Sequence, residues 1–482
     1  MNFCLRGHDR ENGVRELLIC LFPEESHIRT EEPGNDGCVS TAETRDGIIC
    51  TSARVYRAGR VTEGFCDLPA PPDGTEEYKR VLTYCIKTAL YRALLPWAGP
   101  QPWGSLTGVK PAKPVRLALR EGLSEAEADR WLASRYDVEP RRRALCIAAA
   151  RQALAVEDSL LPREIQVYIG IPFCPAKCSY CSFVSNDITR WGHLLEPYFA
   201  ALMEELSAAG TLVRREKLPV GSFYMGGGTP TTLSAIQLDA LLSATRKAFG
   251  LADGTEVTVE AGRPETIDEE KLDVLKARGV TRVSVNPQTM RNEVLQGVGR
   301  RHTAADVERA YAQAQARNFI INMDLIAGLP GDDEAGLLES VRRVIALAPQ
   351  NITIHSLARK KGAKLRFGPA GELAAEMLDR CYDLLAAQGY RPYYLYRQKY
   401  SAGGLENVGF CRGDTASRYN VCMMEELSDV LALGAGGVSK LCAEGGRKIV
   451  RVTNPKYPLE YIRDAEAIAA RKCNLLDIPI SG

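Results

Sequence analysis

The pattern of apolar positions along the chain changes near residue 164. Beyond that point, short apolar runs rich in β-branched residues alternate with longer stretches of mixed polarity. Each longer stretch has room for a crossover helix, and this alternation is typical of parallel βαβ units. Six such units predict an α/β fold with a partial (β/α)6 barrel rather than a closed eight-stranded one. The predicted strands are residues 166–173, 222–225, 256–260, 282–286, 322–326 and 351–356.

The residues before the barrel have the pattern of a separate α+β domain, expected over residues 1–160. The apolar segments 17–22 and 48–56 have strand character. Residues 76–95 repeat apolar side chains on one helical face, and Pro96 is expected to end that helix because proline lacks a backbone N–H. The pattern assigns this domain no role.

The barrel is expected to span residues 161–365, and a C-terminal α+β region, residues 366–482, is expected to cover the substrate. In that region the pattern predicts a helix over 372–388, an aromatic strand over 390–400 and a terminal amphipathic helix over 458–472. Sites in parallel α/β folds lie at the C-terminal ends of the strands. We therefore expect the chemistry at that end of the barrel.

Composition places the 482-residue chain among folded globular proteins, with 45% hydrophobic and 25% charged residues. No apolar run approaches the roughly 18 to 20 residues of a membrane span, and the first residues lack the apolar core of a signal peptide. We therefore expect a cytoplasmic protein without a membrane span. Most of the 15 cysteines stand singly in apolar stretches, as reduced core thiols do.

The charge balance argues against nucleic acid as a partner. The 61 Lys and Arg residues and the 60 Asp and Glu residues leave a net charge of +1, so no overall field attracts a polyanion. Any anion site must therefore be local. The arginines at 141–143, before a helix predicted over 144–156, are expected to form a solvated helix start, with a basic face for an acidic ligand as the alternative.

One group of cysteines breaks the scattered pattern. Cys174, Cys178 and Cys181 form a C-x-x-x-C-x-x-C motif directly after the first predicted barrel strand. A structural zinc site usually takes a fourth ligand from a second pair, and the chain has no second C-x-x-C or H-x-x-x-H pattern. A 4Fe–4S cluster held by three cysteines leaves one iron open to a ligand. The spacing favours the cluster, with zinc or coincident core cysteines as the alternatives.

Polar and glycine residues follow at the ends of the next strands. Residues 226–230 read Gly-Gly-Gly-Thr-Pro at the end of the second strand, where backbone without side chains can approach a ligand closely. Glu260 ends the third strand, Gln288 follows the fourth and Asp324 lies in the fifth. Three polar groups at the same end of successive strands favour a shared site.

A C-x-x-x-C-x-x-C loop after the first strand of a βα series resembles the radical S-adenosylmethionine (SAM) superfamily. The resemblance implies that the open iron binds the amino and carboxylate groups of SAM. An electron from the cluster would then cleave SAM to a 5′-deoxyadenosyl radical that abstracts hydrogen. The protein would position this radical and exclude solvent.

Within that superfamily, residues 168–440 are most similar to the oxygen-independent coproporphyrinogen III oxidase family. The motifs are Tyr-x-x-Ile-Pro-Phe-Cys at the first strand, Gly-Gly-Gly-Thr-Pro-Thr at the second, Asn-Pro-Gln and Gly-Arg-x-His-Thr after the fourth, and Asp-Leu-Ile-x-Gly-Leu-Pro-Gly in the fifth. Residues 103–111 and 406–409 resemble its longer HemZ-type branch, which carries its own N-terminal domain.

The resemblance implies oxidative decarboxylation of two propionate side chains of coproporphyrinogen III to vinyl groups, which yields protoporphyrinogen IX in heme biosynthesis. It also implies a flavodoxin- or ferredoxin-like electron donor and a monomer, and it leaves the catalytic residue unassigned. Two SAM molecules are expected by motif. The SAM on the cluster would contact Tyr168, Gly227 and Glu260. A second SAM would contact Tyr180, Gly228, Thr229, Gln288, Arg300, Asp324 and Ala358.

Two departures from the family pattern keep other activities open. Gly170 stands where the HemN branch has a histidine, and Tyr419 begins Tyr-Asn-Val-Cys-Met-Met where related heme chaperones have His-Asn-x-x-Tyr-Trp. A heme-binding chaperone and a radical SAM tetrapyrrole methyltransferase are the alternative functions. Substrate carboxylates need cationic partners, for which Arg300, Arg397 and Lys399 are candidates.

Overall fold

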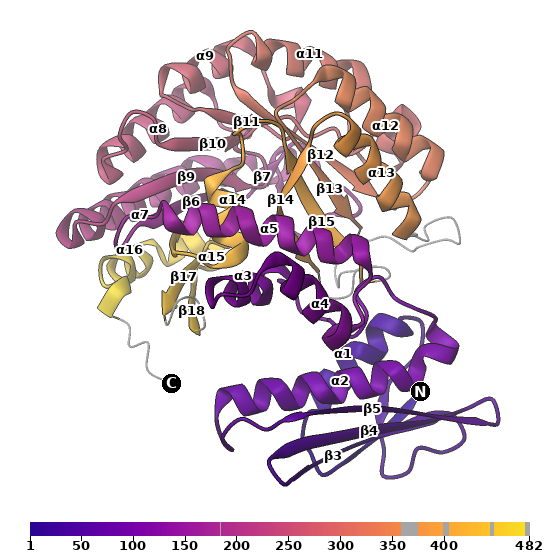
Figure 1. Cartoon of the computed structure of the whole chain (residues 1–482). Helices are drawn as coiled ribbons and strands as arrows, with labels where there is room; N and C mark the ends of the chain where they lie inside the picture. The colour runs from indigo at the N-terminus through magenta and orange to yellow at the C-terminus, as the bar shows by residue number, and fades with distance from the viewer. Residues whose placement is uncertain (184, 358–374, 399–403, 444–447, 478–482) are drawn as a thin grey trace. The chain divides into compact units, whose positions relative to one another are not determined.

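The computed structural model describes residues 1–183, 185–357, 375–398, 404–443 and 448–477. The chain forms two compact units (Figure 1). The first contains Met1–Ala150 and Leu395–Glu406, and the second contains Arg151–Tyr394 and Asn407–Gly482. This division differs from the three segments expected from the sequence, because the residues after 366 do not stand apart but are shared between the two units.

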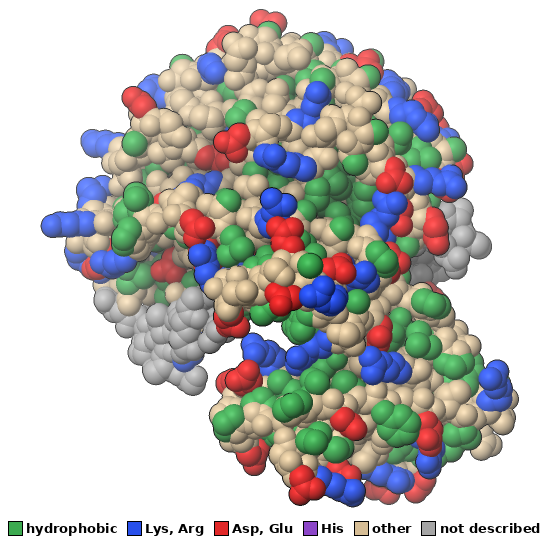
Figure 2. Space-filling view, in the orientation of Figure 1, with side chains coloured by type: hydrophobic (Ala, Val, Ile, Leu, Met, Phe, Trp, Pro, Cys, Tyr) green, Lys and Arg blue, Asp and Glu red, His purple; other side chains and the backbone are tan. Residues whose placement is uncertain are grey.

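Surface charge and helix hydropathy add two observations. Lys and Arg side chains are interspersed with Asp and Glu on the visible face (Figure 2), in keeping with the net charge of +1. Within the part of the chain that the structure describes, no helix combines the length and the apolarity needed to span a bilayer.

The first unit is an α+β domain, as expected. Its five-stranded sheet has the order β2-β1-β3-β4-β5, in which β3, β4 and β5 form an antiparallel meander. Helix α2 packs on β4 and β5, with α1 beside it, and their apolar faces form one core with the sheet (Figure 1). The elements are β1 Asn2–Arg6, α1 Glu11–Leu21, β2 Ile28–Arg29, β3 Gly37–Arg45, β4 Ile48–Arg57, β5 Arg60–Pro69, α2 Glu76–Ala98, α3 Ala112–Arg120 and α4 Glu125–Tyr136.

Two expectations for this unit are wrong in detail. The segment 17–22 forms the last turns and C-terminal cap of α1, not a strand. Val14 and Leu18, one helical turn apart, are fully buried. A helical period of apolar residues can be recognised only in a window longer than the six residues of this segment. Pro96 does not end α2 but lies in its last turn, where it removes one hydrogen bond. The helix ends at Ala98 and is capped by Gly99, which has a φ of 67°.

The second unit is built on six consecutive parallel strands in the order β6-β9-β10-β11-β12-β13. This confirms the expected partial (β/α)6 barrel. The strands are β6 Ile165–Ile171, β9 Val220–Gly227, β10 Glu256–Glu260, β11 Arg282–Ser284, β12 Ile320–Ala327 and β13 Asn351–Ser356. Figure 1 shows α8, α9, α11 and α12 along the outer arc of the barrel. The helices are α7 Leu195–Glu216, α8 Ala235–Phe249, α9 Glu269–Ala277, α10 Asn292–Gly297, α11 Ala304–Gln315 and α12 Glu334–Leu347, with β7 Phe173–Cys174, β8 Asn186–Asp187 and α6 Ile188–Trp191 after β6.

The C-terminal residues extend this sheet at both edges. Strand β16 pairs in parallel with β6, and β15 pairs antiparallel with β13, so that the sheet reaches 11 strands. The elements are α13 Ala375–Ala387, β14 Arg391–Arg397, β15 Glu406–Cys411, α14 Arg418–Glu425, β16 Asp429–Leu433, β17 Val438–Ala443, β18 Lys448–Thr453, α15 Pro458–Arg463 and α16 Ala465–Cys473. Helix α5 (Pro140–Asp158) precedes β6. The terminal helix predicted over 458–472 is divided into the two helices α15 and α16.

A buried ion pair joins α7 to α16. Lys472 Nζ lies 3.1 Å from Glu205 Oε1, and the two side chains are 2% and 1% exposed. The carboxylate also accepts hydrogen bonds from the Tyr461 hydroxyl at 2.5 Å and the Gly434 backbone N–H at 2.8 Å. Gly434 has a φ of 87°, and a Cβ there would lie 2.3 Å from the carbonyl oxygen of Gly170. The pair thus holds the loop after β16 against β6.

Candidate active site

The three motif cysteines lie on the loop that begins at the end of β6. Cys174 and Cys178 are buried, and Cys181 is partly buried. The Cys174 sulfur accepts a hydrogen bond from the Thr229 hydroxyl at 3.4 Å, and the Cys178 sulfur accepts one from Arg263 Nη1 at 3.1 Å. Burial raises the pKa of the Cys174 and Cys181 thiols. Two of the three sulfurs therefore already have donors from neighbouring strand ends.

The glycine segment after β9 lies directly against this loop. The Gly228 N–H donates to Ile171 O and the Thr229 N–H donates to Phe173 O, both at 2.7 Å. A Cβ at Gly228 would lie 2.5 Å from the Phe173 carbonyl oxygen, so only glycine permits this approach. Gly227 has a φ of 108°, in the region that favours glycine. The second strand end is thus tied to the cysteine loop by backbone contacts.

Glu260 and three tyrosines form a cluster across β6, β9, β10 and α14. The Tyr224 hydroxyl donates to Glu260 Oε1 at 2.5 Å. The Tyr224 ring stacks on Tyr419 with centroids 4.6 Å apart and on Tyr168 with centroids 6.2 Å apart. Burial raises the pKa of Glu260 to about 7, and the charge of Asp324 adds to this effect. Glu260 is therefore a carboxyl group that changes protonation near neutral pH.

Asp324 and Asn286 are linked on the next strands. Asn286 Oδ1 accepts from the Asp324 N–H at 3.3 Å, and Asn322 Nδ2 donates to Asp324 Oδ1 at 2.7 Å. His355 Nε2 lies 3.7 Å from Asp324 Oδ2. Burial opposes ionisation of Asp324, but His355 and Asn322 hold the pKa of its carboxyl below the ordinary value. Unlike Glu260, Asp324 is an anion at neutral pH.

Arg300 connects the cysteine loop to these strand ends. Its Nε donates to the Tyr180 hydroxyl at 3.2 Å, and its Nη1 donates to the Asn286 carbonyl oxygen at 2.7 Å. Gln288 has a φ of 68°, and its backbone forms hydrogen bonds with β12 on both sides, to Asp324 O and from the N–H of Ile326. The structure thus brings Tyr180, Gln288, Arg300 and Asp324 together, and Arg300 does not pair with Asp324.

Sequence reasoning missed three residues beside the cysteines. Arg263, three residues after β10, contacts Cys178, and both its Nε and its Nη2 donate to Glu265 Oε1. The other Glu265 oxygen lies 2.9 Å from His302 Nδ1. Burial opposes ionisation of Glu265, but His302 and Arg263 lower its pKa to about 2. The only sequence signals were an Arg-Pro pair after a strand and a histidine within a motif already noted.

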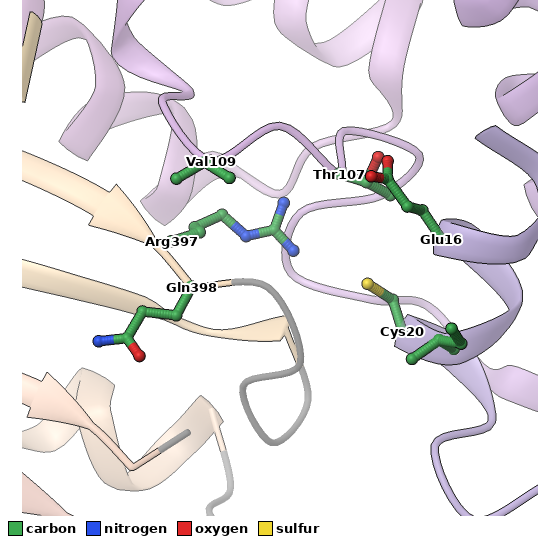
Figure 3. Close-up of a pocket in the computed structure, with 7 residues that line it drawn as sticks. Glu16, Cys20, Thr107, Val109, Arg397 and Gln398 are labelled. Carbon is green, nitrogen blue, oxygen red and sulfur yellow. The ribbon is translucent and has the colours of Figure 1, made fainter. Parts of the chain in front are cut away.

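Arg397 proves to be a structural residue of the first unit. Its Nε donates to Gly404 O at 2.6 Å, its Nη1 donates to Leu106 O, and its guanidinium lies over the Trp103 ring. Figure 3 shows it beside Cys20 in a small pocket of that unit. Its Nε and Nη1 are engaged with carbonyl oxygens of the first unit, and its expected contact with a substrate carboxylate stays a prediction. Lys399 and Ala358 lie outside the described residues.

The expected solvated helix start at 141–143 is wrong for its central residue. Arg142 is completely buried, and its Nε lies 3.1 Å from Glu406 Oε1. The other Glu406 oxygen accepts from Trp103 Nε1 at 2.7 Å. Nothing in the local charge pattern reveals this pairing, because the acidic partner is far away in sequence.

A partial barrel of six βα units with three cysteines after its first strand defines a radical SAM protein, and the model of the Radical SAM superfamily matches residues 168–344. The oxygen-independent coproporphyrinogen-III oxidase-like protein HemZ of Bacillus subtilis is 35% identical over 97% of this chain and 96% of its own length. The chain therefore belongs to the HemZ-type family of oxygen-independent coproporphyrinogen III oxidase-like proteins within that superfamily.

Two further proteins that are similar to this chain have names from heme metabolism. The heme chaperone HemW of Haemophilus influenzae is 28% identical over 65% of this chain and 80% of its own length. The solved structure of coproporphyrinogen III oxidase HemN from Escherichia coli has a TM-score of 0.51 and 22% identity, covering 66% of this chain and 72% of that one. The HemN comparison carries the fold alone.

The cofactors of the chain are those of its superfamily, a 4Fe–4S cluster and SAM. The cysteine loop fits such a cluster by its chemistry, because it offers three thiols, two of whose sulfurs accept hydrogen bonds from Thr229 and Arg263 at the neighbouring strand ends. Among the described residues, no three His, Cys, Asp or Glu side chains converge closely enough to hold a single metal ion. In a 4Fe–4S cluster each cysteine binds its own iron, so the sulfurs need not converge on one point.

Proposed function

We propose that this protein catalyses the oxygen-independent oxidative decarboxylation of coproporphyrinogen III propionates to vinyl groups, with Cys174, Cys178 and Cys181 as the cluster ligands. One observation carries the proposal. A continuous set of contacts runs from the cysteine loop through Tyr180 and Arg300 to Asn286 and the other strand ends. This polar set lies in a chain that matches a coproporphyrinogen III oxidase-like protein over nearly its whole length.

The residues of the chain would bind and orient the reactants. When bound, the cluster supplies the electron that cleaves SAM, and SAM supplies the 5′-deoxyadenosyl group that takes a hydrogen atom from the substrate. Gly227 and Gly228 let the end of β9 pack closely against the backbone of the cysteine loop, and Glu260 can accept a hydrogen bond or a proton from a bound ligand. Arg300, which already contacts Tyr180 and the Asn286 carbonyl oxygen, would orient a substrate carboxylate through a charge-assisted hydrogen bond.

The ligand assignment is tested by comparing buried cysteines. Anaerobically reconstituted protein should contain about four iron and four sulfide per chain. Cys178→Ala should lose the cluster absorption and all SAM cleavage, because only two thiolates remain on the loop. Cys411→Ser is the matched control, since Cys411 is also buried but lies in β15. Full iron content in Cys178→Ala would refute the assignment, and iron loss in Cys411→Ser would reveal a missed ligand.

The reaction is tested by anaerobic turnover and product mass spectrometry. Each vinyl group formed removes one CO2 and two hydrogens from a propionic acid side chain. One hydrogen leaves as an atom to the 5′-deoxyadenosyl group, and the other leaves as a proton while one electron passes to an acceptor. We expect two such losses from coproporphyrinogen III. A product heavier by a methyl group would instead identify a tetrapyrrole methyltransferase.

Stoichiometric heme binding without SAM turnover would identify a heme chaperone, as the HemW relatives suggest. One feature counts against this outcome. At position 419, where those chaperones have histidine, this chain has a tyrosine whose ring packs on Tyr224. A tyrosine binds a heme iron as the phenolate, and burial raises the pKa of Tyr419 well above its ordinary value, which disfavours that form.

A further inference from the structure

A buried cation, Arg263, contacts the cysteine loop at one of its sulfurs. Arg263 follows β10 and is only 4% exposed. Its Nη1 donates to the Cys178 sulfur at 3.1 Å and to the Ala176 carbonyl oxygen at 3.3 Å. One nitrogen therefore contacts both a proposed ligand atom and the backbone that carries it.

Arg263 is held in this position from its other side. Its Nε and Nη2 donate to Glu265 Oε1 at 2.9 and 2.7 Å, and Glu265 Oε2 lies 2.9 Å from His302 Nδ1. The His302 side chain is 0% exposed. A guanidinium fixed by two bonds to one carboxylate oxygen has little freedom to leave the sulfur. The contact is thus a built feature of the site.

The contact also makes the three cysteines unequal. The Cys174 sulfur accepts from the neutral hydroxyl of Thr229 at the longer distance of 3.4 Å. Charge-assisted hydrogen bonds are roughly twice as strong as neutral ones. Hydrogen bonds to the sulfurs are among the factors that set the reduction potential of an iron–sulfur cluster. Reduction adds a negative charge, so a cation at one sulfur stabilises the reduced state.

We propose that Arg263 is a positioning residue that raises the reduction potential of the cluster through its hydrogen bond to Cys178, and that Glu265 and His302 hold it there. This inference rests on the proposed function, because it requires Cys178 to be a cluster ligand. Its consequence is easier one-electron reduction of the cluster by whatever donor serves the enzyme.

The test is a redox titration of the reconstituted, SAM-free protein, with dithionite as the reductant and the EPR signal of the reduced cluster as the readout. Arg263→Gln should make reduction at least tenfold less favourable, a fall of about 59 mV for a one-electron couple. Thr229→Val, which removes the neutral donor at Cys174, is the matched control and should shift the potential less. An unchanged potential in Arg263→Gln, or an equal shift in Thr229→Val, would overturn the proposal.

A second variant guards against loss of the protein. Arg263→Gln leaves Glu265 without its cation, and that carboxylate would itself lower the potential. Arg263→Gln/Glu265→Gln removes both charges and should still show a fall in potential, because the hydrogen bond to Cys178 is lost. Iron content separates the two hypotheses. Full iron with a wild-type potential in the Arg263 variants rejects only this inference, whereas full iron in Cys178→Ala rejects the ligand assignment of the proposed function.

Discussion

The protonation of Glu260 gives a prediction whose magnitude follows from the structure. Burial raises the pKa of this carboxyl from an ordinary 4.5 to about 7 in the ligand-free fold. One tenfold change in proton affinity is worth about 1.4 kcal/mol, so the whole shift corresponds to about 3 kcal/mol. Because the folded pKa is the higher one, this contribution to stability is fully present below about pH 4.5. It is lost as the pH rises through about 7.

Glu260→Gln should remove this dependence while keeping an oxygen that accepts from the Tyr224 hydroxyl. The variant should be nearly as stable as the wild type at pH 5 and more stable by about 2 to 3 kcal/mol at pH 8. The assay is native-state hydrogen exchange of peptides from β9 and β10 in cluster-free protein. Wild type and variant are compared at the same pH, so that intrinsic exchange rates cancel.

Two results would refute the reasoning. Parallel pH profiles for wild type and variant would mean that Glu260 titrates near its ordinary pKa, so that water or a cation reaches it. If the wild type instead became more stable relative to Glu260→Gln as the pH rises, the ionised Glu260 carboxylate would have a stabilising partner. Either result would also remove Glu260 as a group that exchanges a proton near neutral pH.

Three further predictions concern the fold around the site and the proposed second pocket. Lys472→Met should lower the free energy of unfolding by about 3 to 5 kcal/mol, because it leaves the buried Glu205 carboxylate without its cation. Glu205→Gln/Lys472→Met should recover most of that loss in thermal unfolding, and equal stability of the single and double variants would contradict the prediction. Gly434→Ala should lower the melting temperature more than Gly436→Ala, because both residues have positive φ but only at Gly434 would a Cβ meet backbone atoms. Equal effects would mean that the backbone does not approach Gly434 closely. Arg300→Ala should still form 5′-deoxyadenosine without substrate yet lose more than about tenfold in product, since one charge-assisted contact is worth roughly 1.5 to 3 kcal/mol; unchanged turnover per cluster would assign it to stability alone.

Local sequence determined the barrel and the position of its chemistry. The strands at 256–260 and 351–356 have the predicted bounds, because buried parallel strands are apolar runs that end abruptly at polar loops. The spacing of Cys174, Cys178 and Cys181 is a property of one loop, which can be read without knowing what surrounds it. A local sequence pattern is enough to predict a feature that lies within one strand or one loop.

The tertiary structure alone decided which charges meet. Arg263 contacts Cys178 across 85 residues of sequence, and Arg142 pairs with Glu406, which lies at the start of β15. An arginine on a helix or after a strand has the same local sequence pattern whether its guanidinium contacts water or a buried carboxylate. The difference is the desolvation of both partners, which depends on the packing of distant segments and leaves no periodic trace in the sequence.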